Sequence, residues 1–264
     1  MPRFYFEVAR AAFRRQMIYR WANVSGLVTN IFFGAIISAV FIAVFQSRHL
    51  AAGYTIRDTL RYWWMAQSLV MVILPFGWFD LMLTIRTGEV ASDLSKPCDF
   101  YWYWFSREAG RDVYFLLFRA VPTYLAGMLL FGIGVPGGPV DWIAYVPSLA
   151  IGAASGIAFR VLYNLVAFWI LEARAVGGIA QVLAHFFTGL YVPIAFFPPL
   201  LAAVSAWLPF NALENVPVEV VLGKVSGANL AMELARQALW LVALTLAARG
   251  LAAVAARRVI VQGG

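Results

Sequence analysis

The sequence predicts an all-α integral membrane protein with six transmembrane helices, an N-terminal interfacial helix and an extracellular re-entrant segment between spans five and six. Three observations lead to this fold class. Hydrophobic residues make up 62% of the 264 residues and charged residues only 12%, whereas soluble domains contain roughly 45–50% apolar and about 25% charged residues. Several uncharged runs are long enough to cross a bilayer. The charged residues are concentrated between those runs.

The net charge of +7 does not indicate a nucleic-acid partner, because the 20 Lys and Arg residues flank apolar runs instead of forming one basic surface. Such a placement is typical of a membrane orientation signal. The single cysteine, Cys98, excludes an internal disulfide framework. Residues 1–20 contain five arginines and no continuous apolar stretch, so we expect no cleavable signal peptide.

The first element is expected to be an interfacial helix over residues 1–21. Drawn as a helix, this segment separates a charged face from an apolar stripe, which is the pattern of a helix lying in the plane of the membrane surface. The apolar stripe consists of Phe6, Ala9, Phe13 and Met17. Such a helix either anchors the chain against anionic lipid or acts as an elbow that transmits movement into the first span.

Four largely apolar runs follow and predict the first four spans; the first two carry no charge, whereas the third contains Arg119 and the fourth Arg160. The runs cover residues 22–45, 62–79, 113–133 and 142–165, and each approaches the roughly 20 residues that a helix needs to cross the hydrocarbon core. Tryptophans bound the second run, as expected at membrane interfaces. A turn cluster of glycines and prolines from residue 134 to 139 predicts a tight hairpin between the third and fourth spans.

Residues 175–213 carry no formal charge and form a run too long for one ordinary span. Proline removes a backbone donor, and irregular backbone inside a bilayer must be covered by protein. The prolines in this run are Pro193, Pro198, Pro199 and Pro209. We therefore expect a fifth span followed by an extracellular re-entrant region over residues 193–224, and a sixth span at residues 231–256. The candidate cap residues are Pro209, Phe210, Pro217, Gly223 and Lys224.

The distribution of basic residues predicts the orientation. Under this six-span arrangement, 13 Lys and Arg residues lie on one side of the membrane and four on the other. The four are Arg48, Arg57, Arg61 and Lys224. Cytoplasmic loops are enriched in Lys and Arg, so both termini and Lys96 are predicted to be cytoplasmic.

The sequence lacks catalytic signatures, and the few charged or polar residues within the spans have structural explanations. The sequence has no P-loop and no H-E-x-x-H motif, so this chain is not expected to hydrolyse ATP. His185 is expected to be a buried, hydrogen-bonded side chain or else a contact for substrate or protons. Arg119 and Arg160 are expected to snorkel towards the cytoplasmic surface. Gly152 and Gly156 form a G-x-x-x-G pair, interpreted as helix packing within one subunit.

Residues 84–112 form the longest charged interval and are expected to lie in water or at the membrane surface. Thr87 or Gly88 can begin a short helix, and Pro97 prevents its continuation. This compact segment is either a solvated loop or a docking element for a soluble partner. In the docking interpretation Leu94 supplies the apolar contact and charged residues form a polar rim. The candidate coupling residues are Arg86, Gly88, Glu89, Leu94, Lys96 and Pro97.

The sequence resembles the bacterial ABC-2 permeases over nearly its whole length. The resemblance implies a single transmembrane domain of residues 1–264. The resemblance rests on the N-terminal interfacial helix, the Arg-Thr-Gly-Glu segment leading to Leu-Ser-Lys-Pro97, the Leu-Pro-Phe210 stretch with a later Leu-Gly-Lys224, and a Gly-Gly tail. It implies a multi-pass protein of the bacterial cytoplasmic membrane that pairs with a second permease subunit, in a homodimer or a heterodimer. It also implies two ATP-binding subunits that dock at residues 84–112.

The resulting hypothesis is the permease subunit of an ATP-driven exporter that moves a hydrophobic or amphipathic substrate out of the cytoplasm or inner leaflet. The chain itself is expected to hold no cofactor, since ATP and Mg would bind to the partner subunits. An ATP-independent channel or secondary transporter is the alternative, and it predicts mid-span charges and internal repeats, neither of which is clear in the sequence. An intramembrane enzyme would need a convergent acid–base cluster, which the sequence does not suggest.

Overall fold

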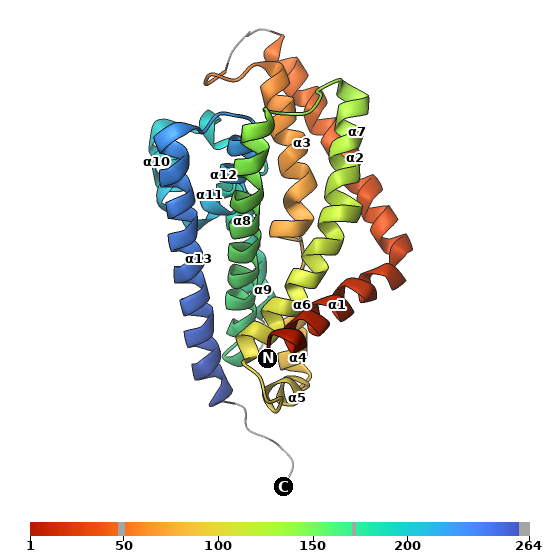
Figure 1. Cartoon of the computed structure of the whole chain (residues 1–264), viewed down its shortest axis with the longest axis vertical. Helices are drawn as coiled ribbons and strands as arrows, with labels where there is room; N and C mark the ends of the chain where they lie inside the picture. The colour runs from red at the N-terminus through yellow and green to blue at the C-terminus, as the bar shows by residue number, and fades with distance from the viewer. Residues whose placement is uncertain (47–50, 171–172, 259–264) are drawn as a thin grey trace.

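The computed structural model describes residues 1–46, 51–170 and 173–258. These residues form helices and no named strand; the one β-bridge among them joins Ala51 and Tyr54. Figure 1 shows an elongated bundle in which α1 (Pro2–Ile18) and α5 (Val90–Leu94) lie near one end. The all-helical fold class predicted from composition is therefore confirmed for the described residues.

Four helices in the described part of the chain are long and apolar enough to cross a membrane. They are Arg20–Phe45 (α2), Phe100–Phe131 (α6, η1 and α7), Pro139–Phe168 (α8 and η2) and Gly227–Ala256 (α13). The predicted spans 22–45, 142–165 and 231–256 each lie within one of these helices. Between α7 and α8, glycines with positive φ angles turn the chain, as the glycine-proline cluster predicted.

The second of these helices begins earlier than predicted. It consists of α6 (Phe100–Phe115), a π-helical turn η1 (Leu116–Ala120) and α7 (Val121–Phe131). The Asp99 side chain caps its start by accepting a hydrogen bond from the Trp102 amide at 3.0 Å. Residues 100–112 are thus part of the long helix, and Glu108, Arg111 and Asp112 are buried within the protein; the position of residues 84–112 relative to the membrane stays a prediction.

The predicted second span, residues 62–79, is not one helix. α3 (Ile56–Ile73) starts at a capping box formed by Thr55 and Asp58 and ends two residues before Pro75. Proline lacks the amide needed to continue the helix and disfavours helical backbone before it. The chain from 74 to 79 is irregular and leads to α4 (Asp80–Arg86), then to α5.

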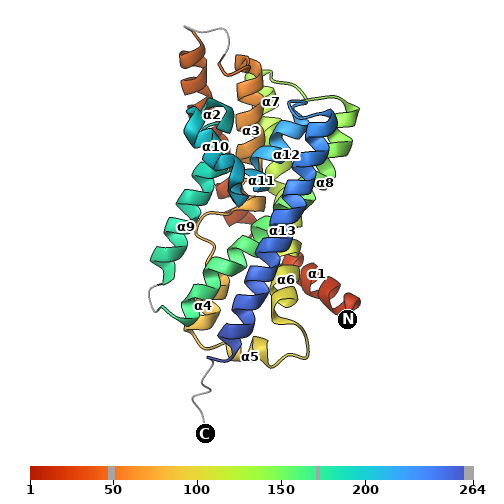
Figure 2. The same ribbon diagram turned by 90° about the vertical axis from the view of Figure 1, so that its left-hand side faces the viewer.

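The proline-rich part of the chain is broken into short helices, as predicted. α9 (Ala173–Phe187) is followed by η3 (Ile194–Phe196), and no helix continues through Pro198 and Pro199. Two later helices start with proline at a first-turn position, where the missing amide costs least. The remaining elements are α10 (Pro199–Trp207), α11 (Pro209–Leu213) and α12 (Asn215–Val221). Figure 2 shows these last three in the half of the molecule opposite α5.

Glycines allow helices to pack closely. A Cβ atom at Gly110 would lie 1.9 Å from the Ala9 carbonyl oxygen, so this glycine lets α1 lie directly against α6. Cβ atoms at Gly152 and Gly156 would similarly meet the backbone of Leu213 and Ile73. The G-x-x-x-G pair therefore packs against segments of the same chain, which confirms its interpretation as intrasubunit packing.

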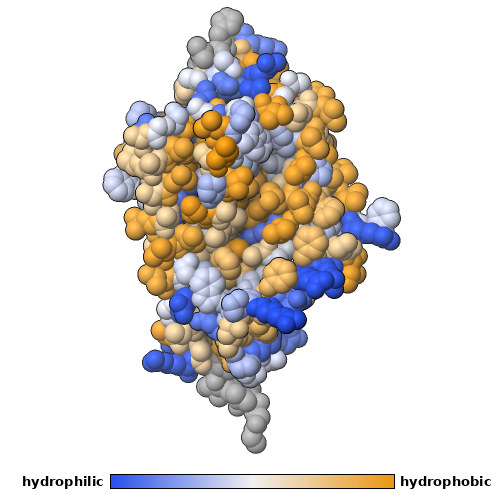
Figure 3. Space-filling view, viewed as in Figure 1, coloured by the Kyte–Doolittle hydropathy of each residue, from blue (hydrophilic) through white to orange (hydrophobic). Residues whose placement is uncertain are grey.

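The outer surface is strongly apolar. Large side chains such as Leu129 (86% exposed) and Leu200 (79% exposed) point outwards. Figure 3 shows apolar residues over the middle of the molecule, with hydrophilic residues gathered at the two ends and along α1. A surface of this kind is stable in lipid and not in water, so the chain is a membrane protein.

Candidate functional site

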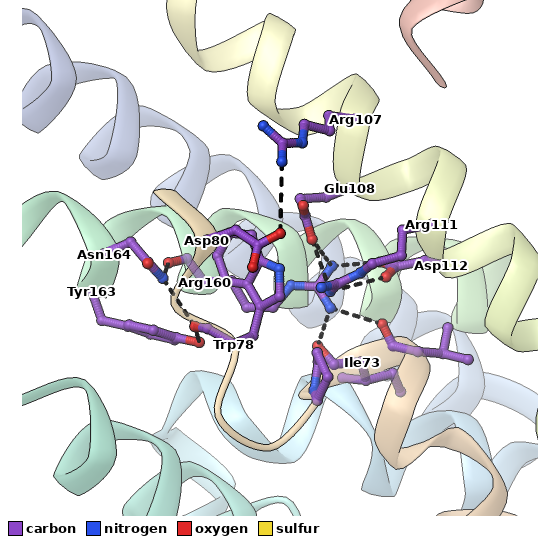
Figure 4. A network of polar contacts seen from close by, with 12 residues as sticks. Ile73, Trp78, Asp80, Arg107, Glu108, Arg111, Asp112, Arg160, Tyr163 and Asn164 are labelled. Carbon is purple, nitrogen blue, oxygen red and sulfur yellow. Dashed lines mark hydrogen bonds and ion pairs between the residues drawn. The ribbon is translucent and has the colours of Figure 1, made fainter. Parts of the chain in front are cut away.

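Four charged side chains meet in the interior beside the irregular segment between α3 and α4 (Figure 4). Glu108, Arg111 and Asp112 project from α6, and Arg160 projects from α8 (Pro139–Leu165). We refer to these four residues as the charge cluster. All four are buried, and Arg160 is fully inaccessible to solvent. The cluster joins three regions that lie far apart in the sequence.

Arg160 is the centre of the cluster. Its Nη2 atom lies 2.5 Å from Oδ2 of Asp112 and 3.9 Å from Oε2 of Glu108. Its Nη1 atom donates to the carbonyl oxygens of Val72 (3.0 Å) and Ile73 (3.2 Å). Those carbonyls belong to the last turn of α3, where the helix has no backbone donors left and carries partial negative charge. Arg160 therefore ties the end of α3 to α6 and α8.

Arg111 completes the charge balance. Its Nη2 atom lies 2.8 Å from Glu108 Oε2 and 3.7 Å from Asp112 Oδ1. Its guanidinium group lies over the Trp78 ring at 5.2 Å from the centroid, a cation–π arrangement. Two guanidinium groups thus face two carboxylates. Burial of charge is tolerated when the charges are paired in this way.

Side chains from α8 and α9 hold the irregular segment 74–79 in place. The Tyr163 hydroxyl donates to the Trp78 carbonyl at 3.0 Å, and Gln181 Oε1 accepts from the Gly77 amide at 3.0 Å. His185 Nε2 lies 2.7 Å from the Leu74 carbonyl oxygen. These side chains satisfy backbone groups that the helix break would leave unpaired. The prediction that His185 is a buried, hydrogen-bonded side chain is confirmed.

The start of α4 is attached to the same framework. Asn164 Oδ1 accepts a hydrogen bond from the Met82 amide at 2.9 Å. The partly exposed Arg107 side chain lies 3.6 Å from the Asp80 carboxylate. α4 is therefore held by both α6 and α8. Because α4 ends at Arg86, it runs directly into residues 86–97.

The predicted coupling residues lie together on the short stretch that follows α4. Arg86, Gly88, Glu89 and Pro97 are exposed, whereas Leu94 and Lys96 are half-buried. The short helix α5 begins at Val90, two to three residues later than predicted, and the φ angle of +79° at Gly88 makes the turn before it. Gly88 tolerates this conformation because it lacks a side chain.

Lys96 is held within this stretch. Its Nζ atom lies 2.6 Å from Asp93 Oδ1 and 2.9 Å from the Tyr103 hydroxyl. Burial acts to lower the pKa of Lys96, but the hydrogen bonds to Asp93 and Tyr103 outweigh it and raise the pKa above its usual value. Lys96 therefore stays charged and fixes the end of α5 against α6.

The predicted cap residues fall into two groups. Phe210 and Pro217 pack inwards: the Phe210 ring lies 5.2 Å from that of Phe159, and Pro217 is buried. Pro209 begins α11. Gly223 and Lys224 are exposed at the end of the bundle, where Lys224 Nζ lies 3.2 Å from Asp58 Oδ2. The structure thus joins the first turn of α3 to the loop after α12 but does not gather all five residues at one site.

The charge cluster itself was missed by the sequence analysis. Arg160 and Arg119 were expected to snorkel, and both are buried instead, so that expectation is wrong. The signal present in the sequence was the spacing of Glu108, Arg111 and Asp112, since residues three or four apart share a helix face. This spacing places the three charged residues on one helix face, but it does not identify Arg160 as their partner.

Comparison with known proteins identifies the family. A family model described as ABC-2 family transporter protein matches residues 31–262. No curated protein and no solved structure matches the chain. The matched range contains the charge cluster, segment 86–97, three of the four long apolar helices and the second half of α2. The chain therefore belongs to the ABC-2 family of transporter proteins, the membrane components of ABC transporters.

Proposed function

We propose that this chain is the permease subunit of an ATP-driven exporter that moves a hydrophobic or amphipathic substrate out of the cytoplasm or inner leaflet. Separate subunits bind ATP and Mg, and a second permease subunit completes the membrane part. One observation carries the proposal: the exposed segment 86–97 continues from α4, which polar contacts fix to α6 and α8. A soluble motor that pushes this segment therefore acts on the long helices.

The proposed topology has six passes, made by α2, α3 with α4, α6 to α7, α8, α9 and α13. Both termini are cytoplasmic, and residues 193–224 enter from the outside and return. The position of α5 near the end of α13, with Lys224 at the opposite end, supports this arrangement. The excess of Lys and Arg on the α5 side supports it further. Arg48, part of that comparison, lies outside the described residues.

Coupling in this proposal is mechanical. ATP binding shifts the partner subunits and with them α5 and α4. The Arg107–Asp80 pair and the Asn164–Met82 hydrogen bond transmit the shift to α6 and α8, and the charge cluster keeps the end of α3 in register. Such a transition needs two arrangements of the same helices that both partners bias.

The test measures retention of the ATP-binding subunits after purification from the native membrane, together with transport. Leu94→Asp removes the half-buried apolar contact of segment 86–97, and Glu89→Lys reverses an exposed charge on its rim. We expect both variants to lose the partner while inserting normally, because an apolar side chain is worth about 1.5–3 kcal/mol when it is buried at a contact.

Glu7→Lys is the matched control, since Glu7 is an exposed acid on α1 that pairs with Arg10. The control should retain the partner. If Leu94→Asp and Glu89→Lys retain the partner and still transport, residues 86–97 are a solvated loop and the coupling proposal is wrong.

Single cysteines at positions 57, 96 and 224, in a chain lacking Cys98, test the topology. An impermeant thiol reagent should reach positions 57 and 224 from outside intact cells and not position 96.

A further inference from the structure

We infer that a polar pocket between α1 and α6 binds the phosphate group of an anionic membrane phospholipid. The pocket has a volume of about 280 Å³, room for a group of several heavy atoms, since one water molecule takes up about 30 Å³ in the liquid. In Figure 4 one of its side chains, Arg107, extends from α6 towards Asp80. The polar lining includes Arg15 and Gln16 from α1, Tyr103, Arg107 and Arg111 from α6, and Asp80 at the start of α4.

The pocket carries one positive charge that no acid of the protein balances. Its lining contains three arginines and two acids, Asp80 and Glu108. The acids are already paired: Arg107 lies 3.6 Å from Asp80, and Arg111 lies 2.8 Å from Glu108. Arg15 is exposed and forms no ion pair with any residue that the structure describes. The single negative charge of an anionic phospholipid matches this excess.

The arginines on α6 have donors that the protein does not use. The 3.6 Å separation of Arg107 from Asp80 is too long for a hydrogen bond. The buried Nε atom of Arg111 has no hydrogen-bond partner within the described part of the chain. Arg107 is nevertheless held in position, because its guanidinium group lies 4.4 Å from the centroid of the Trp104 ring. A fixed guanidinium group with unused N–H donors is suited to phosphate oxygens.

The surroundings of the pocket favour a lipid over a free phosphate ion. Only Tyr19 separates α1 from α2, which is apolar and long enough to cross the membrane. Ile18 (78% exposed) and Trp21 (75% exposed) lie at this junction, and exposed aromatic and basic residues together are typical of the headgroup level. Arg15 and Ile18 also line an adjoining hollow on α1. Apolar surface for acyl chains thus begins beside the arginine that lines the pocket.

This site differs from a general attraction between a basic helix and anionic lipid. It needs side chains of both α1 and α6, so a bound headgroup would bridge the two helices. Glu108 and Arg111 belong to the pocket and to the charge cluster alike, so the bound phosphate would lie beside the ion pairs that join α6 to α8. The inference goes beyond the proposed export function and does not depend on it.

The test counts the lipids bound to the purified full-length chain by native mass spectrometry from micelles of a nonionic detergent. Phosphatidylglycerol and phosphatidylethanolamine with the same acyl chains are titrated separately. We expect one phosphatidylglycerol to bind about tenfold more tightly than phosphatidylethanolamine. Arg15→Gln and Arg107→Gln should each weaken this binding about tenfold, the loss expected when one charge-assisted hydrogen bond is removed. Ala11→Glu should weaken it too, because it adds a negative charge at an exposed position of the lining and removes no arginine contact.

Arg3→Gln is the matched control, because it removes the same charge from an exposed position of α1 outside the pocket. It should leave the tight binding unchanged. Equal losses from Arg3→Gln and Arg15→Gln would mean that α1 attracts anionic lipid without a site, and would overturn the inference. So would displacement of the lipid by an equal concentration of glycerol phosphate, which would assign the pocket to a soluble phosphate. Displacement by the ATP-binding subunits would also overturn it, because the pocket would then belong to a subunit interface.

Discussion

Two buried arginines on the long helices have very different surroundings. Arg160 on α8 faces two carboxylates and two backbone carbonyls within the charge cluster. Arg119, on the π-helical turn η1, donates to the Asn30 side chain at 3.1 Å and lies over the Phe115 ring. Among the residues that the structure describes, no carboxylate lies within ion-pair distance of Arg119. One arginine is part of a balanced network, whereas the other has only neutral partners.

The difference shows that burial alone does not tell what a charged residue does. A buried ion pair costs desolvation of both charges, and its removal as a pair is often neutral, whereas removal of one partner is costly. Arg160 therefore has a structural role that its neighbours depend on. Arg119 leaves no opposite charge behind when it is replaced, so its loss should be far cheaper.

The largest effect is expected from Arg160→Met. This change leaves two carboxylates facing one guanidinium group and frees two carbonyls at the end of α3. Loss of one partner from a buried pair costs about 3–5 kcal/mol, so the free energy of unfolding in mixed micelles should fall by that amount. Arg160→Lys keeps the charge but not the forked geometry. Its free energy of unfolding should therefore lie between those of the unchanged protein and Arg160→Met. An unchanged unfolding midpoint would mean that the cluster does not hold α3, α6 and α8 together.

The double variant Arg160→Met with Asp112→Leu should be more stable than Arg160→Met alone. It restores the charge balance, because Glu108 and Arg111 remain as a pair 2.8 Å apart. Residues in one ion-pair network show interaction energies of about 0.5–3 kcal/mol. A double-mutant cycle of unfolding free energies measures this value. Simple additivity of the two single losses would contradict direct coupling between Arg160 and Asp112.

A smaller effect is expected from Arg119→Met. The change removes one hydrogen bond to Asn30, and a typical hydrogen bond contributes about 0.5–1.5 kcal/mol to stability. It also removes a buried charge whose neighbours are neutral, which offsets part of that loss. Asn30→Ala is the matched comparison from the other side of the bond and should cost more, because it leaves the guanidinium group with no hydrogen-bond partner of its own. A loss from Arg119→Met equal to that of Arg160→Met would show that Arg119 has a charged partner.

Much of the fold was predictable because bilayers impose simple rules. Long apolar runs predicted three of the long helices to within a few residues, and the prolines correctly indicated a broken segment after α9. The second run was misjudged although Pro75 lies inside it, because the absence of charge was given more weight than the missing proline amide. The start of α6 was predicted too late in the sequence, because its charged residues were expected to lie in water or at the membrane surface.

The charge cluster was not predictable from local pattern. Arg160 lies 48 residues from Asp112 along the chain, and only the packing of α8 against α6 brings them together. The spacing of Glu108, Arg111 and Asp112 shows a common helix face, but it does not show whether that face meets water or another arginine. The coupling residues of segment 86–97 were easier to propose, because an exposed loop between spans needs no distant partner to be recognised.

The smallest effect is expected from Lys224→Met, which tests whether exposure sets the cost of breaking a pair. Lys224 Nζ lies 3.2 Å from Asp58 Oδ2, but the two side chains keep 30% and 25% of their exposure. Water and salt screen such a pair, and exposed pairs contribute about 0.2–1 kcal/mol. Methionine retains most of the aliphatic stem of lysine but lacks the Nζ atom that lies 4.6 Å from the centre of the Tyr54 ring, so the loss includes this cation–π contact. We expect a small loss of unfolding free energy that shrinks further as salt is raised, whereas the loss from Arg160→Met should not depend on salt. If Lys224→Met were as damaging as Arg160→Met, the contrast between buried and exposed pairs would fail, and the contact between the first turn of α3 and the loop after α12 would have to be a principal support of the fold.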